Sequence, residues 1–109
     1  MKLSVVMPVY NEKNTVEQIV GLVKAVEGVE KEIIIVDDAS KDGTVEILKK
    51  LQTSQPDLKI FFKNTNKGKG DTLKVGFKMT TGDYVIVQDA DLEYDPRDYK
   101  KLIRTLDEE

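Results

Sequence analysis

The sequence of 109 residues contains neither cysteine nor histidine. Without cysteine the chain forms no disulfides and no thiolate metal sites, and without histidine it has no imidazole ligand and lacks the usual general base. Any metal ion that this chain binds must therefore be held by oxygen atoms. Charged residues make up 34% of the chain and hydrophobic residues 39%, a balance typical of one globular domain with a real core.

Long hydrophobic runs and a strong positive charge are missing as well. The first apolar run, residues 3–7, is too short for a signal peptide and is cut by Pro8, and no stretch approaches the roughly 18 to 20 apolar residues of a membrane span. We therefore expect a cytoplasmic location. The formal net charge of -3 argues against nonspecific binding of nucleic acid, so we expect no nucleic-acid partner.

What is present is an alternation of strand and helix patterns. Apolar runs predict strands at residues 3–7, 32–36, 58–62 and 84–87, the third nearer a sheet edge because of Lys59. Apolar residues at helical spacing predict a helix after each strand, the first over residues 15–26 with Asn14 and Glu17 as a capping pair. The second helix begins with Asp42, Gly43 and Thr44. In the third helix, one side is formed by Leu73, Gly76, Phe77 and Thr80. The last helix begins at Asp95 and Pro96, and its buried side consists of Tyr99, Leu102, Ile103 and Leu106.

This alternation predicts an α/β fold, a mainly parallel sheet of about four strands with right-handed crossovers and helices on both faces. If the first three strands run outward in one direction and the fourth returns beside the first, the strand order reverses between strands one and four. Ligands of such sheets bind outside the carboxyl ends of the strands, near that reversal. The loops at residues 8–12, 37–44 and 89–93 would meet there.

Two carboxylates, Asp89 and Asp91, follow the fourth apolar run directly. Side chains at positions i and i+2 of an extended segment point to the same side, so these two can converge on one hard cation, and Glu93 continues the alternation. A polar turn before the last helix is the alternative interpretation. A second acidic cluster at residues 37–43 follows another apolar run in the same arrangement, which favours a functional rim over a simple turn.

The carboxylates gathered at this edge of the sheet need a positive charge nearby to offset their mutual repulsion. Two carboxylates about 4 Å apart repel by roughly 4 kcal/mol at an effective dielectric near 20. Mg²⁺ or Mn²⁺ offsets that repulsion, and Mg²⁺ typically uses one or two protein carboxylates together with substrate phosphates. This combination indicates a diphosphate substrate at this edge of the sheet.

Residues 64–70 form a basic, glycine-containing loop before the third helix. Its backbone amides and the side chains of Lys67 and Lys69 can approach a phosphate or a nucleobase. The loop is not a dinucleotide fingerprint, because Leu73 stands where a third glycine should be, and it is not a P-loop, because Lys63 replaces the leading glycine. A surface loop whose lysines provide solubility is the alternative.

Four ordered motifs, at residues 8–12, 37–44, 66–70 and 89–91, together resemble the family 2 inverting glycosyltransferases of the GT-A fold, and among them the polyprenol-phosphate group that includes the dolichol-phosphate mannosyltransferases. The last motif resembles the DxD metal site of that family. The resemblance covers nearly the whole chain and implies a three-layer, Rossmann-like nucleotide-binding half domain.

The resemblance also implies roles for individual residues. Asp38 would accept a hydrogen bond from a base NH, and Asp91, helped by Asp89, would hold Mg²⁺ or Mn²⁺ on the diphosphate, with Glu93 beside the metal. Strand termination and packing remain the alternative for Pro8 and Tyr10, and we expect only one of the two loop lysines to touch substrate. The residues implied at the nucleotide are Pro8, Tyr10, Glu12, Asp38, Lys67, Lys69, Asp89 and Ala90.

The implied partners are a UDP- or GDP-linked sugar and, in a full-length enzyme at the cytoplasmic membrane face, a polyprenyl-phosphate acceptor. Family members are considerably longer, so residues 1–109 are expected to be a donor-binding half that ends after the DxD motif. We expect this half to lack activity alone and to self-associate through apolar surface along its fourth strand. No catalytic residue is assigned. The rival interpretation is a noncatalytic nucleotide-binding or structural fragment.

Overall fold

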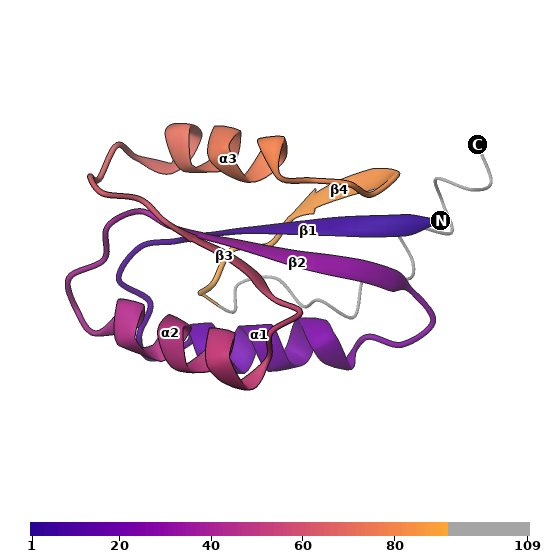
Figure 1. Cartoon of the computed structure of the whole chain (residues 1–109), viewed down its shortest axis with the longest axis horizontal. Coiled ribbons are helices and arrows are strands. Elements are labelled where there is room, and N and C mark those ends of the chain that lie inside the picture. The colour runs from indigo at the N-terminus through magenta and orange to yellow at the C-terminus, as the bar shows by residue number, and fades with distance from the viewer. Residues whose placement is uncertain (92–109) are drawn as a thin grey trace.

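The computed structural model describes residues 1–91 and shows strands and helices in strict alternation (Figure 1). The strands are β1 (Lys2–Val9), β2 (Glu30–Asp37), β3 (Lys59–Phe62) and β4 (Tyr84–Val87), and the helices are α1 (Val16–Ala25), α2 (Thr44–Ser54) and α3 (Lys69–Lys78). The predicted last helix and Glu93 lie outside the described residues.

The four strands form one parallel sheet in the order β3-β2-β1-β4. Helix α3 covers one face, and helices α1 and α2 lie together on the other (Figure 1). The predicted α/β architecture is confirmed, and so is the reversal of strand order between β1 and β4. Because all strands are parallel, the loops that follow β1, β2 and β4 leave from the same edge of the sheet.

The core lies mainly between the sheet and the layer formed by α1 and α2. Helix α1 contributes Val16, Ile19, Val20 and Val23, the three-and-four spacing of a helix with one buried face. The inner strands are buried on both faces, as continuous apolar runs in parallel sheets usually are. These two strands therefore form a rigid base for the loops beyond them.

Strand β1 runs through Pro8 to Val9, whereas the sequence predicted that Pro8 ends the strand. The carbonyl of Val6 accepts a hydrogen bond from Gln88 on the β4 side, and the carbonyl of Val9 accepts one from Asp38 on the β2 side. Backbone groups of a strand alternate in direction, so the missing N–H of Pro8 lies on the β4 side. There the β1–β4 ladder has already ended at Val87, and no ladder bond is lost.

One prediction about helix details is wrong, and a second is wrong in part. Asn14 and Glu17 do not form a capping pair, because α1 has Thr15 as its N-cap and that cap makes no side-chain capping bond. Helix α3 buries Gly76 as predicted, but its other buried residue is Thr72, whereas Phe77 is 44% exposed and Leu73 and Thr80 are only partly buried. Close approach explains the second error, because a Cβ at position 76 would lie 2.5 Å from a methyl carbon of Val6.

Strand β4 is an edge strand in the part of the chain that the structure describes. Tyr84 and Ile86 pack against the core, whereas Val85 and Val87 are 45% and 39% exposed. An apolar strip on β4 was predicted, and these exposures agree with it. Self-association through the strip stays a prediction.

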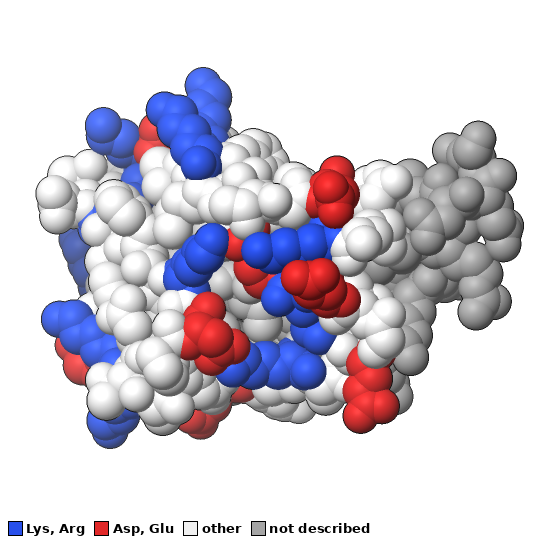
Figure 2. All heavy atoms as spheres, turned by 45° about the vertical axis from the view of Figure 1, so that its right-hand side comes forward, with Lys and Arg blue, Asp and Glu red and all other residues white. Residues whose placement is uncertain are grey.

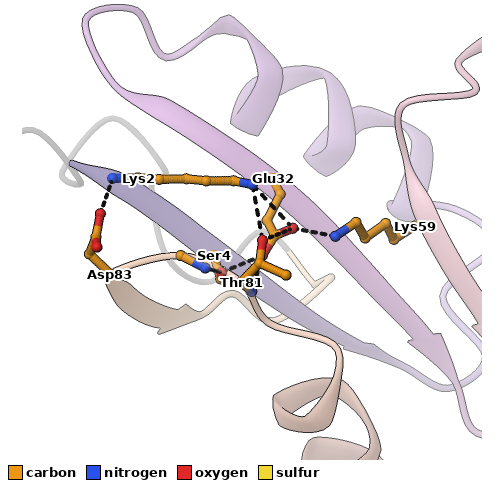
Figure 3. Close-up of polar contacts among 7 residues, drawn as sticks. Lys2, Ser4, Glu32, Lys59, Thr81 and Asp83 are labelled. Carbon is orange, nitrogen blue, oxygen red and sulfur yellow. Dashed lines mark hydrogen bonds and ion pairs between the residues drawn. The ribbon is translucent and has the colours of Figure 1, made fainter.

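The amino end of the sheet is closed by a polar network around Glu32 (Figure 3). Its carboxylate accepts hydrogen bonds from the Ser4 hydroxyl, the Lys59 ammonium, and the backbone N–H and hydroxyl of Thr81. Burial opposes ionisation of Glu32, but these bonds outweigh it and lower its pKa to about 2. The network ties β1, β2 and β3 to the turn between α3 and β4.

A second groove at the amino end, about 550 Å³, is lined largely by lysine and acidic side chains. Lys24 pairs with Asp57, and Lys59 and Lys2 pair with Glu32. Figure 2 shows lysine and acidic side chains interspersed on one face of the molecule. Most of the charged side chains that line this groove are paired with one another, so the groove gives no indication of a ligand site. None of the described helices is long and apolar enough to cross a membrane.

Candidate functional site

A cleft of about 480 Å³ opens at the carboxyl end of the sheet, beside the point where the strand order reverses. Its lining brings together eight of the residues singled out in the sequence, namely Pro8, Tyr10, Glu12, Asp38, Lys69, Asp89, Ala90 and Asp91. Lys67 is not among the lining residues. The sequence interpretation missed four others, Val9, Asn66, Gly68 and Thr72, although three of them stand in or next to motifs that it had named.

The loops after β1 and β2 hold each other in place. The backbone N–H of Asn11 donates to the Ser40 hydroxyl at 2.8 Å, and the N–H of Lys41 donates to the Asn11 side chain at 2.9 Å. The N–H of Glu12 donates to the Thr44 hydroxyl at 3.0 Å. These bonds turn the first two signature motifs into one wall of the cleft.

Adjacent acids in the second motif have different tasks. Asp37, the last residue of β2, is fully buried and accepts hydrogen bonds from the backbone and the hydroxyl of Ser40, so it shapes the turn. Asp38 faces the cleft. The left-handed φ of Ala39, 59°, is the backbone bend that follows this pair.

Asp38 is only 4% exposed, and its carboxylate is bound by the basic loop on the other side of the cleft. The Lys63 ammonium and the Lys67 N–H donate to Oδ1 at 2.7 and 3.0 Å, and the Gly68 N–H donates to Oδ2 at 3.0 Å. Burial alone would raise the pKa of Asp38, but these donors lower it, so the group is held ionised. The second and third motifs are therefore joined through one carboxylate.

Lys63 is the buried cation beneath the cleft, with its side chain 7% exposed. Besides Asp38 it pairs with Asp71 at 2.6 Å and donates to the Thr72 hydroxyl at 3.2 Å. Burial would lower the pKa of Lys63, but its two carboxylate partners raise it above its ordinary value. Lys63 stands where a P-loop would have its leading glycine. Here its side chain anchors the basic loop and the first turn of α3.

Asp89 and Asp91 both line the cleft on the side of β4. Oδ1 of Asp89 lies 2.7 Å from the Lys69 ammonium. The Thr15 hydroxyl donates to the carbonyl of Ala90, between the two acids. The turn after β4 is thereby fixed against the start of α1.

A divalent cation fits this donor set in chemistry and in number. Within residues 1–91 no cluster of three or more carboxylates is arranged to hold a metal. Two carboxylates on one cleft wall are nevertheless the number that Mg²⁺ commonly takes from a protein when phosphate oxygens complete its octahedron. Asp89 and Asp91 are the described residues that would hold it.

Comparison with known proteins agrees with this arrangement. The model of glycosyl transferase family 2 matches residues 4–109. The dolichol-phosphate mannosyltransferase of Pyrococcus furiosus is 36% identical over 107 residues, which make up 97% of this chain and 30% of that protein. The chain thus spans about a third of that relative's length.

Solved structures of similar fold include complexes with UDP-GlcNAc and with GDP-Man. S. aureus TarS 1-349 in complex with UDP-GlcNAc superposes with a TM-score of 0.81 at 29% identity, over 99% of this chain and 32% of that one. The mannosyltransferase PcManGT from Pyrobaculum calidifontis, in complex with GDP-Man and Mn²⁺, gives a TM-score of 0.76 at 28% identity, over 88% of this chain and 29% of that one. With the family model, the parallel sheet and the cleft in agreement, the chain belongs to glycosyl transferase family 2.

Proposed function

We propose that the cleft binds the nucleoside-diphosphate part of a sugar donor together with Mg²⁺ or Mn²⁺, for inverting transfer to an acceptor. The observation that carries the proposal is the convergence of the loops after β1, β2 and β4 with the start of α3 on one cleft. The complexes of TarS with UDP-GlcNAc and of PcManGT with GDP-Man and Mn²⁺ support the ligand class.

Base recognition is assigned to Asp38. A carboxylate has about four acceptor positions, and three of them on Asp38 are taken by Lys63, Lys67 and Gly68. Among residues 1–91, Oδ2 accepts only the Gly68 N–H, so the remaining position is on this oxygen. It suits a single ring NH, as in uracil or guanine, and the lowered pKa keeps the acceptor available.

The diphosphate is assigned to the part of the cleft between the start of α3 and the turn after β4, next to the loop amides that bind Asp38. Helix α3 begins at Lys69, and the first backbone N–H groups of a helix favour an anion. Asp89 and Asp91 would hold the cation, which stabilises the charge of the nucleoside diphosphate as it leaves. Thr15 holds the carbonyl between these two acids in place.

A polyprenyl phosphate is the proposed acceptor of the whole protein. Its support is the identity to a dolichol-phosphate mannosyltransferase. A phosphate acceptor is already ionised at neutral pH and needs less help from a general base than a hydroxyl does. The proposal therefore assigns no general base to the described residues.

Calorimetry tests the donor site. The chain is titrated with UDP, GDP, UDP-GlcNAc and GDP-mannose, with Mn²⁺ or with a chelator, and we expect binding that depends on the cation. Asp91→Asn should weaken it at least tenfold, about 1.4 kcal/mol. Asp57→Asn is the control, because Asp57 is an exposed carboxylate at the amino end. Absence of all nucleotide binding would favour the rival interpretation of a structural fragment.

A further inference from the structure

One ion pair crosses the proposed donor cleft. Lys69 is the first residue of α3, and Asp89 follows β4, yet the Lys69 ammonium lies 2.7 Å from Oδ1 of Asp89. Both residues line the cleft. Their side chains are 58% and 24% exposed, so the pair stands at the open side of the cleft and both members can exchange partners.

In this pair the Lys69 ammonium, a monovalent cation, contacts Asp89, which is a proposed ligand of the divalent cation. An ammonium and Mn²⁺ repel each other strongly at contact distance, and both are attracted to the same carboxylate. Occupancy of Asp89 by Lys69 and occupancy by the metal are therefore competing states. In each state, the cation bound to Asp89 offsets the repulsion between the carboxylates of Asp89 and Asp91.

We propose, building on the proposed donor site, that Lys69 is a competing cation that the divalent metal displaces from Asp89, and that the displaced ammonium then binds the diphosphate. A lysine ammonium is a compact point charge on a flexible stem and is suited to phosphate. It needs only to turn within the cleft, because its backbone lies at the N-terminal end of α3, where an anion is already favoured. Metal and nucleotide would consequently bind together better than either binds alone.

The same geometry distinguishes the two loop lysines. Lys67 contributes its backbone N–H to Asp38, and its side chain is not among those that line the cleft. Lys69 begins the helix, lines the cleft and pairs with Asp89. We expect only one of these two lysines to touch substrate, and this geometry favours Lys69.

The test separates metal from nucleotide. Binding of Mn²⁺ alone is measured from the electron paramagnetic resonance signal of free Mn²⁺, for the wild type and for Lys69→Met. Loss of an exposed ion pair is expected to strengthen Mn²⁺ binding about threefold to fivefold. Binding of UDP or GDP at saturating Mn²⁺ is expected to change in the opposite direction, weakening at least threefold.

Two further variants serve as controls. Lys74→Met removes the same charge from an exposed position of α3 outside the cleft, and it should leave both affinities within twofold. Lys69→Arg keeps a cation beside Asp89 and should leave the Mn²⁺ affinity near that of the wild type. Unchanged or weaker Mn²⁺ binding in Lys69→Met, or equal strengthening in Lys74→Met, would overturn the competition. Since the Mn²⁺ titration contains no nucleotide, its outcome is independent of whether the donor site binds UDP or GDP.

Discussion

The hydroxyl of Thr15 donates a hydrogen bond to the backbone carbonyl of Ala90, linking the start of α1 to the turn that carries Asp89 and Asp91. The same hydroxyl lies 3.1 Å from the Glu12 carboxylate, so one side chain joins the first motif to the last. Neither contact is visible in the linear sequence. Together they make Thr15 a positioning residue for the proposed cation site.

Replacing Thr15 by valine keeps the shape of the side chain and removes the donor. We expect cation-dependent UDP or GDP binding to weaken about threefold to tenfold, because the turn loses one hydrogen bond of roughly 1 kcal/mol. Calorimetry of Thr15→Val is compared with Thr53→Val, whose hydroxyl donates to the carbonyl of Lys49 within α2. Equal affinities for the two variants would mean that Thr15 does not position the site.

Asp38→Asn tests base recognition. The neutral amide retains the size of the carboxylate but offers fewer acceptor positions to Lys63, the loop amides and a base NH. We expect UDP or GDP to lose at least tenfold in affinity and pyrophosphate to lose much less, since the phosphates are assigned to the start of α3 and the cation and not to the Asp38 carboxylate. Equal losses for nucleotide and pyrophosphate in parallel titrations would assign Asp38 to the scaffold alone.

Glu32 should make the fold sensitive to acid. Its pKa is lowered from 4.5 to about 2 in the folded state, so its contribution to stability is complete above about pH 4.5 and is lost as the pH falls towards 2. The contribution is on the order of 3 kcal/mol. Urea unfolding at pH 6 and pH 3 should show a difference between wild type and Glu32→Gln that shrinks at the lower pH. Glu30→Gln, at an exposed position of the same strand, serves as the control. A difference that does not change with pH would contradict the assignment.

Gly76→Ala tests the close approach of α3 to the sheet. A Cβ there would lie 2.5 Å from a Val6 methyl carbon, and we expect a loss of about 1–3 kcal/mol in the free energy of unfolding. Gly21→Ala is the matched change in α1, where nothing lies within 4 Å of the added carbon, and it should be neutral or stabilising by up to about 1 kcal/mol. Equal effects in thermal or urea unfolding would show that α3 can move away without cost.

The strand order was predictable because the strands are uninterrupted apolar runs and because crossovers between parallel strands leave few topologies. Residues that line the cleft were predictable where they have ionisable side chains and belong to a recognised motif, as Asp38 and Asp89 do. Thr72 and Gly68 were missed because their positions depend on where α3 begins, which propensity does not define. Glu32 was counted as part of a strand, since its network forms with Ser4 and Thr81, which are distant in the chain.

The most direct measurement of the central claim is a map of amide chemical shifts in the ¹⁵N-labelled chain during titration with UDP or GDP and Mg²⁺. We expect changes at Tyr10, Glu12, Asp38, Gly68, Lys69 and Ala90, around the cleft, and none at Glu32 or Thr81 at the amino end. Shifts confined to the cleft and abolished by chelation would support a cation-dependent donor site. Shifts centred on the amino-end groove, or shifts at the cleft that persist without the cation, would contradict it.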